Sequence, residues 1–223
     1  MPESNRLQLN PALSFLQALS ILNIPDDVEE GNETDTHADA TANKKDGGKG
    51  KKMNMSFQLK RMLATAFWLG LMPFAPGTFG TLLGVLIHVA VYSFLPLSWH
   101  VLALTIALFL VSYANHALTP WAKSHWGKDD PGNFVLDEVA GYLVVPILFH
   151  QGDLWQVVFW GFLLFRVYDI IKIPPARQID RKLHGSWGIL LDDLVSATYA
   201  VLTMYFLVWL GVQMGWSDWL IRP

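Results

Sequence analysis

Long uncharged stretches constrain this chain more than any other feature of its sequence. After about residue 56 the chain alternates apolar runs with short polar connectors, and a membrane-spanning helix needs about 20 mostly apolar residues. Hydrophobic residues make up 52% of the chain and charged residues only 16%, a balance too apolar for an ordinary soluble domain. Because lipid offers no partner to backbone N–H and C=O groups, these runs must be helical. We therefore expect an all-α, polytopic integral membrane protein.

The apolar runs predict four to five membrane segments. They cover residues 81–95, 100–118, 134–149, 154–171 and 189–212. The segment at 134–149 is short, so it either spans the membrane or re-enters it. Lys and Arg residues help to choose, because cytoplasmic connectors carry an excess of them. They occur before the first segment, between the second and third, and between the fourth and fifth, while the alternate connectors contain none. This alternation favours five spans and a cytoplasmic N-terminus.

Residues 1–55 differ in composition from the rest of the chain. A run of acids leads into a Lys- and Gly-rich stretch, and such a segment cannot bury enough apolar surface to offset its ordering entropy. We expect a disordered extension there, followed by one membrane-embedded domain at 56–223. The net charge of −3 gives no reason to expect nucleic acid as a partner. The absence of cysteine means that any metal must be held by oxygen or imidazole.

The predicted topology gathers acidic residues on one face of the membrane. Asp137 and Glu138 begin the third segment, and Asp169 ends the fourth. Asp192 and Asp193 begin the fifth. Carboxylates at a membrane edge are costly unless they are paired or bound to a metal, so their concentration indicates a functional site. Hard oxygen ligands favour Mg²⁺, which also partners substrate phosphate. We predict that these five acids bind Mg²⁺ and carry catalysis.

Each acid also has a simpler structural explanation. Acids at the start of a helix stabilise its dipole, and this applies to the pairs at 137–138 and 192–193. Asp169 stands at a helix end, where the dipole disfavours an anion, but Arg166 and Lys172 lie one helical turn away as ion-pair partners. The dipole does not explain why two acidic pairs and a single acid share one face. The metal-site prediction therefore stands beside these alternatives.

Residues around the acids are predicted to bind an anionic substrate. They are Gly77, Thr78, Arg166, Lys172, Asp180 and His184. Arg166 and Lys172 suit a phosphate group. The glycine-containing turn at Gly77 can bring backbone N–H groups close to a phosphate oxygen at the start of the first segment. In the connector before the fifth segment, Asp180 is expected to position the loop and His184 to donate a proton.

Four short blocks contain most of these residues. They are Gly70-Leu-Met-Pro-Phe-Ala-Pro-Gly-Thr-Phe-Gly80, Asp130-Pro-Gly-Asn-Phe-Val-Leu-Asp-Glu-Val-Ala-Gly141, Phe165-Arg-Val-Tyr-Asp-Ile-Ile-Lys172 and Gly185-Ser-Trp-Gly-Ile-Leu-Leu-Asp-Asp193. In this order they resemble the phosphatidylglycerophosphatase A family, and the resemblance covers roughly residues 57–213. It implies a bacterial inner-membrane enzyme that removes the terminal phosphate of phosphatidylglycerophosphate, leaving phosphatidylglycerol, at the cytoplasmic face.

Topology and resemblance together predict a Mg²⁺-dependent lipid phosphatase whose partner is a membrane phospholipid. Two mechanisms remain open, direct attack by metal-activated water and a covalent aspartyl intermediate. A CDP-alcohol phospholipid transferase is an alternative, but the acidic ladder over two turns of one helix that we expect of it is absent. An ion transporter is a more remote alternative, because it would place acids near mid-membrane or along a pore.

Overall fold

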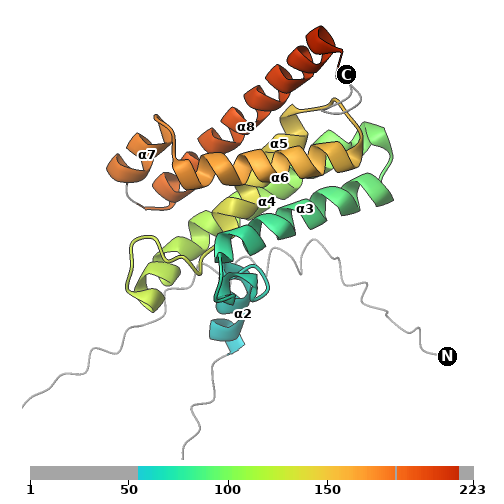
Figure 1. Ribbon diagram of the computed structural model, residues 1–223. Coiled ribbons are helices and arrows are strands. Elements are labelled where there is room, and N and C mark those ends of the chain that lie inside the picture. The colour runs from blue at the N-terminus through green and yellow to red at the C-terminus, as the bar shows by residue number, and fades with distance from the viewer. Residues whose placement is uncertain (1–54, 184, 216–223) are drawn as a thin grey trace, which may run out of the picture. The chain divides into compact units, whose positions relative to one another are not determined.

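The computed structural model describes residues 55–183 and 185–215. The predicted disordered extension at 1–55 lies outside this range except for Met55. Every regular element in the described residues is a helix (Figure 1). The elements are α2 (Met55–Ala64), the 3₁₀ turn η1 (Leu69–Leu71), α3 (Pro76–Phe94), α4 (Leu97–Trp126), α5 (Leu136–Leu148), α6 (Leu154–Ile171), α7 (Ala176–Lys182) and α8 (Ser186–Met214). The chain divides into two units between Leu59 and Lys60, within α2, and every element from η1 to α8 belongs to the second unit.

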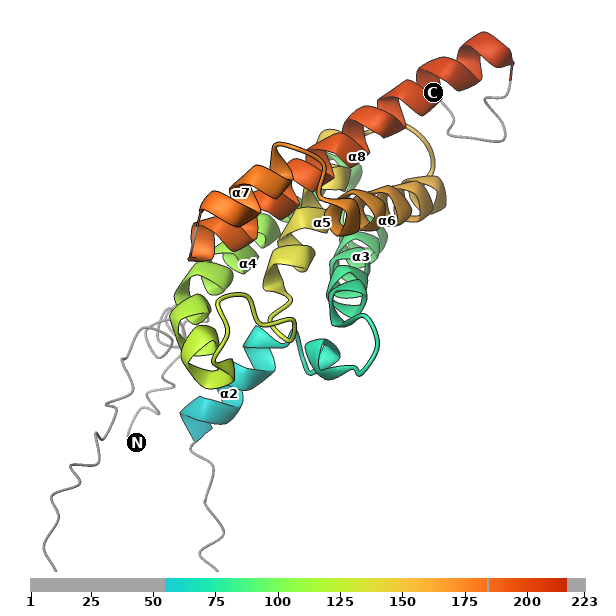
Figure 2. The same cartoon turned by 60° about the vertical axis from the view of Figure 1, so that its left-hand side comes forward.

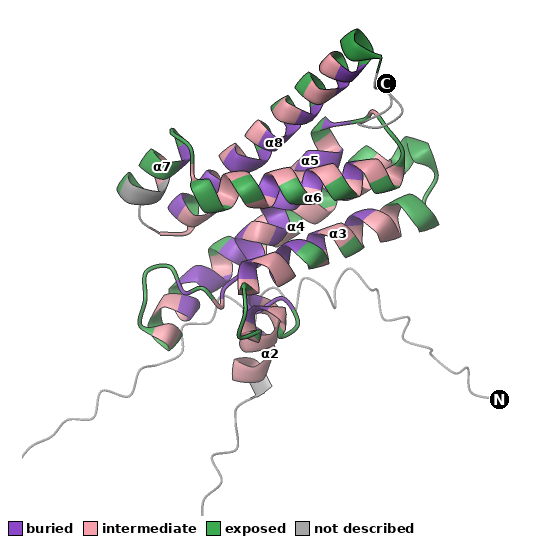
Figure 3. Ribbon diagram, in the orientation of Figure 1, coloured by how far each residue is buried: buried purple, intermediate pink, exposed green. Residues whose placement is uncertain are grey.

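Four of these helices, α3, α4, α6 and α8, are long and apolar enough to cross a membrane. Large apolar side chains on them, such as Leu86, Phe109 and Phe159, are more than half exposed on the isolated chain. Exposed positions recur along these helices (Figure 3). Exposed apolar surface of this extent is stable in lipid and not in water. The chain is therefore an all-α membrane protein with four to five membrane segments, as predicted.

Helix α5 is the short central element of the bundle. Its 13 residues rise only about 20 Å, less than the ~30 Å thickness of a hydrocarbon core. It packs against α3, α4, α6 and α8. Val139, Ala140 and Leu143 on it have no exposed surface. Since neighbouring helices cover its sides, α5 can bring carboxylates into the bundle without exposing them to lipid.

The five helices α3, α4, α5, α6 and α8 alternate in direction (Figures 1 and 2). One end of the bundle therefore holds the starts of α3, α5 and α8 together with the ends of α4 and α6, and we call it the acidic end. The loop before α5 is tied to the loop before α3 there, because the Asn133 side-chain amide donates to the Gly70 carbonyl over 2.9 Å. At the opposite end, residues from the end of α3 and the starts of α4 and α6 line one common cavity.

Several helix boundaries differ from the predicted segments for local reasons. Helix α3 begins at Pro76, five residues before the predicted start, because proline is well suited to the first helical position. Helix α4 continues to Trp126 and ends where Gly127 adopts a left-handed conformation. Helix α8 begins at Ser186, and the short helix α7 occupies a connector for which no helix was predicted. Helix α6 has the predicted bounds, with Asp153 capping its first turn.

Candidate active site

A cavity of about 230 Å³ opens at the acidic end, among the α4–α5 loop, the start of α5, the end of α6 and the first turns of α8. Six of its lining residues are acidic: Asp130, Asp137, Glu138, Asp169, Asp192 and Asp193. Lys172 is the one basic residue among those that line it. The five acids predicted from separate stretches of sequence therefore share a single cavity, together with one further acid.

Three of these acids form a compact group. Asp137, Glu138 and Asp193 each offer a carboxylate oxygen, and the three oxygens lie within 4.8 Å of one another. Asp137 and Asp193 are 8% and 3% exposed. Like charges held this close in a buried position repel one another and lose their hydration, which is unfavourable unless a cation or protons neutralise them.

The oxygen atoms of this group also lack protein partners. Asp137 Oδ1, Glu138 Oε2 and Asp193 Oδ2 are buried and accept no hydrogen bond within the described residues. Most buried polar atoms in proteins are hydrogen-bonded, so three unpartnered carboxylate oxygens in one place call for a ligand. Oxygen-only donors at this spacing fit a hard divalent cation. The residues present therefore fit the metal expected from the sequence.

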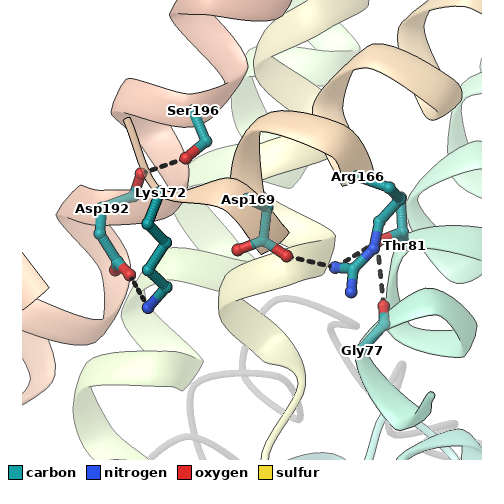
Figure 4. A network of polar contacts seen from close by, with 7 residues as sticks. All are labelled: Gly77, Thr81, Arg166, Asp169, Lys172, Asp192 and Ser196. Carbon is teal, nitrogen blue, oxygen red and sulfur yellow. Dashed lines mark hydrogen bonds and ion pairs between the residues drawn. The ribbon is translucent and has the colours of Figure 1, made fainter. Parts of the chain in front are cut away.

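The other two predicted acids, Asp169 and Asp192, form ion pairs (Figure 4). Arg166 Nη1 lies 2.7 Å from Asp169 Oδ2, and the two side chains are 13% and 12% exposed. Lys172 Nζ lies 2.6 Å from Asp192 Oδ2. Asp169 thus forms the ion pair with Arg166 that one of the structural explanations predicted. Lys172 forms an ion pair with Asp192. Lys172 lines the cavity, and Arg166 is held beside it by Asp169, which also lines it.

Local structure explains where the Arg166 and Lys172 side chains lie. Arg166 points from α6 toward the first turns of α3, where it also approaches Thr81 Oγ1 at 3.4 Å (Figure 4). Lys172 follows the last residue of α6 and adopts a left-handed backbone conformation with φ of 49°. This conformation ends the helix and turns the chain toward the start of α8. The two cations thereby come from one helix end but contact different helices.

The dipole explanation for Asp192 and Asp193 is wrong. Helix α8 begins at Ser186, so these residues occupy its second turn, and its first turn contains no acid. Stabilisation by the helix dipole falls off within the first turn. For Asp137 and Glu138 the explanation survives, because both lie in the first turn of α5. The position of the α8 acids is therefore explained by the cavity they line and not by helix capping.

Gly77 contributes to the site for a different reason from the one predicted. The left-handed residue of the turn before α3 is Ala75, with φ of 45°, and Gly77 already lies in the first turn of the helix. A Cβ atom on Gly77 would overlap Glu138 Oε1 and stand 3.0 Å from Arg166 Nη2. Gly77 is thus required for close approach. Thr78 donates its backbone N–H to the Ala75 carbonyl at 2.9 Å and does not line the cavity.

Two predicted substrate-binding residues cannot be placed in the site. Asp180 belongs to α7, and the position of its side chain is not described; His184 lies outside the described residues. Conversely, Asp130 lines the cavity and was not predicted as a site residue. Its sequence signal was its place on the same face, seven residues before Asp137, in a Pro-Gly loop. Thr81 was also missed, because a threonine inside an apolar run carries no distinguishing signal.

The fold and the site together define a class of protein: a helical membrane protein with a buried carboxylate cluster, flanked by an arginine and a lysine, at one end of its bundle. Such a site can hold a divalent cation against a phosphate group carried by a lipid. The acids lie at one end of the bundle, which disfavours an ion path through mid-membrane.

Comparisons with known proteins identify the family. The sequence model of phosphatidylglycerophosphatase A matches residues 62–208. The Haemophilus influenzae protein named phosphatidylglycerophosphatase A is 33% identical over 144 residues, which cover 65% of this chain and 85% of that protein. The Escherichia coli protein of the same name is 32% identical over 146 residues, covering 66% and 81%. The chain belongs to the phosphatidylglycerophosphatase A family, a family of phosphatases.

One further relative differs in name. A Bacteroides thetaiotaomicron protein with the provisional name phosphatidylinositol-3-phosphatase is 32% identical over 152 residues, which cover 66% of this chain and 92% of that protein. No solved structure matches the chain. Family membership confirms the predicted resemblance and the enzyme class. It also removes support from the transferase and transporter alternatives.

Proposed function

We propose that this protein hydrolyses the terminal phosphomonoester of phosphatidylglycerophosphate to phosphatidylglycerol and phosphate, in a reaction that requires Mg²⁺. The observation that carries the proposal is the buried group of Asp137, Glu138 and Asp193, at one end of a helical membrane bundle. The names of the Haemophilus influenzae and Escherichia coli relatives support the substrate. A substrate anchored in lipid presents its phosphate at the membrane edge, which is where a bundle end lies.

Asp137, Glu138 and Asp193 are the residues that would hold the metal. Their unpartnered oxygens are available as ligands without breaking a hydrogen bond of the described structure. When bound, Mg²⁺ would polarise the phosphomonoester and lower the pKa of a coordinated water. Asp130, at the exposed mouth of the same cavity, adds a carboxylate where solvent and substrate enter.

Arg166 and Lys172 are the residues that would bind the phosphate oxygens. Each is already oriented by a carboxylate, Arg166 by Asp169 and Lys172 by Asp192. Held side chains lose little further freedom on binding, so they can stabilise charge that develops on the phosphoryl group. In this assignment Asp169 and Asp192 position cations and border the metal group. Both remain essential, as the sequence predicts.

The acidic end would face the cytoplasm, in the inner membrane of a bacterium. Lys60, Lys123 and Lys172 mark the three connectors at this end, while the connectors around 96–99 and 150–153 at the other end contain neither Lys nor Arg. Cytoplasmic connectors carry this excess.

Phosphate release by the purified full-length protein tests the proposal. The substrates are phosphatidylglycerophosphate, phosphatidylinositol 3-phosphate and phosphatidic acid in mixed micelles, each with Mg²⁺ and with excess EDTA. We expect release from phosphatidylglycerophosphate that stops on chelation and returns with Mg²⁺. Faster release from the inositol lipid would show that phosphatidylinositol 3-phosphate is the preferred substrate, in line with the name of the Bacteroides thetaiotaomicron relative. Activity unaffected by chelation would overturn the metal assignment.

A further inference from the structure

A second hollow, of about 400 Å³, lies between α4 and α8 and is separate from the acidic cavity. Its walls come from the stretch 108–116 of α4 and the stretch 186–194 of α8, and its surface is mostly apolar, with Ser112, Tyr113, His116 and Ser186 as the polar residues of its lining. Both helices are long and apolar enough to cross the membrane. The hollow is therefore a groove in a surface that meets lipid, and we call it the α4–α8 groove.

The α4–α8 groove is polar at one end and apolar at the other. At the acidic end His116 Nδ1 and Ser186 Oγ are 2.6 Å apart, and the Trp187 ring stands 5.8 Å from the His116 ring. Helices α4 and α8 are antiparallel, so lower residue numbers in α4 and higher ones in α8 both lie further from the acidic end (Figure 2). Leu108 and Leu194 each lie eight residues from it, about 12 Å further along their helices. The groove thus becomes apolar with distance from the acidic end.

The α4–α8 groove also adjoins the acidic cavity around α8. Leu190 and Leu194 line the groove, while Asp193, between them in sequence, lines the acidic cavity. Successive helical residues point about 100° apart, so Leu190 and Asp193 stand on neighbouring faces of the same turn. A single molecule with a phosphate at one end and a hydrocarbon chain at the other can reach both sites around one helix.

We propose that the α4–α8 groove binds one acyl chain of the phospholipid substrate, with the His116–Ser186 pair at the level of its glycerol and ester groups. The inference rests on the proposed function and names the part of the substrate that the acidic cavity does not bind. Its basis is the match between two gradients. A phospholipid passes from phosphate through polar esters to hydrocarbon, and the protein passes from carboxylates and cations through His116 and Ser186 to Leu108 and Leu194. The cavity at the opposite end also combines histidines such as His88 and His100 with apolar side chains, but it lies at the far end of the bundle from the acidic group.

A chain-length comparison tests the groove. Leu194→Trp narrows its deep end, and Leu202→Trp is the control, because Leu202 lies two turns further along α8, exposed and outside the groove. The substrates are phosphatidylglycerophosphate with two palmitoyl chains and with two hexanoyl chains. We expect Leu194→Trp to lower kcat/KM for the long-chain lipid about tenfold, the effect of losing roughly two buried methylenes. The short-chain lipid should be turned over as by the unaltered protein, and Leu202→Trp should change neither.

A binding measurement keeps this inference separate from the proposed reaction. The probe is phosphatidylglycerol with a photoactivatable diazirine at the end of one acyl chain, added to the purified protein with Mg²⁺ present. We expect labelling within residues 108–116 and 187–194 that unlabelled phosphatidylglycerol competes away and that Leu194→Trp reduces. Labelling that spreads over the exposed faces of α3 and α6, and that unlabelled phosphatidylglycerol does not reduce, would contradict the groove as the acyl-chain site.

The two experiments fail in different ways. If no lipid releases phosphate but labelling maps to the α4–α8 groove, the proposed reaction is wrong and the lipid site stands. If phosphate is released but Leu194→Trp and Leu202→Trp have the same ratio of kcat/KM for long-chain and short-chain lipid, the reaction stands and the groove assignment is wrong. Equal loss on both chain lengths in Leu194→Trp would also count against the groove, because it would indicate a general structural defect.

Discussion

The carboxylate of Glu138 occupies the space in which the Cβ atom of any other residue at position 77 would stand. Gly77 belongs to the first turn of α3 and Glu138 to the first turn of α5, so this contact fixes how closely two helix starts approach. The absence of a side chain at one position thereby determines where a metal ligand lies on another helix. Arg166 shares the contact, because its Nη2 would stand 3.0 Å from the same Cβ.

Gly77→Ala should therefore weaken metal binding more than it weakens the fold. The added methyl displaces the end of a flexible side chain, so the helices keep their places while the Glu138 oxygen moves. We expect the Mg²⁺ concentration for half-maximal activity to rise about tenfold, as when a residue supporting a metal ligand is changed. Gly132→Ala is the matched control, because a Cβ there meets nothing within 4 Å although Gly132 lines the same cavity. An equal effect in both variants would refute the steric explanation.

Asp193→Asn should stabilise the metal-free protein and abolish its activity. The substitution removes one buried negative charge from a group of three, so the unfavourable repulsion among Asp137, Glu138 and Asp193 falls. In EDTA we expect a higher Tm than for the unaltered protein, and with Mg²⁺ we expect only the unaltered protein to gain Tm. The control is Asp153→Asn, at the opposite end of the bundle, because Asn caps a helix about as well as Asp. A Tm gain with Mg²⁺ in Asp193→Asn would show that the metal binds elsewhere.

Lys172→Met should reduce both stability and turnover, and a second substitution should separate the two effects. Asp192 is 3% exposed, and the loss of an ammonium 2.6 Å away leaves its charge poorly compensated, at a cost of about 1–3 kcal/mol. Adding Asp192→Asn removes that charge. We expect the double variant to recover most of the free energy of unfolding but no phosphatase activity, measured by denaturant titration and phosphate release. Recovery of activity would mean that Lys172 serves only to neutralise Asp192.

Arg166→Lys should raise the KM for phospholipid with a smaller change in stability. Arg166 Nη1 makes both contacts, with Asp169 Oδ2 at 2.7 Å and with Thr81 Oγ1 at 3.4 Å. The planar guanidinium has further N–H donors in a fixed geometry that an ammonium cannot reproduce. We expect kcat/KM to fall at least about tenfold, the order of one lost charge-assisted hydrogen bond. Thr81→Val, which removes the weaker contact together with the hydrogen bond that the Thr81 hydroxyl donates to the Gly77 carbonyl, should have a much smaller effect. The reverse ranking would place the functional contact at Thr81.

The sequence by itself determined the membrane class, the positions of the long apolar helices and the end of the bundle at which the acids lie. Each of these depends on the local content of apolar and charged residues, because lipid admits helices and charges settle at its edges. The bounds of α6 follow for the same reason, since Asp153 supplies the helix cap and the apolar run ends where Lys172 begins the connector. The family also followed from the sequence, because its four blocks carry the residues of the site.

Only the tertiary structure decided what each site residue contacts. Sequence spacing allowed Asp169 to pair with either cation, and the packing of α6 against α3 and α8 gave it Arg166 and left Lys172 to Asp192. The tertiary structure also places Gly77 against Glu138 and brings Asp130 to the cavity. The start of α8 at Ser186 excludes helix capping as the reason for Asp192 and Asp193. The Lys172–Asp192 pair and the places of Gly77 and Asp130 depend on distances between residues far apart in the chain. Such distances are fixed when helices pack side chain against side chain, and no local pattern encodes them.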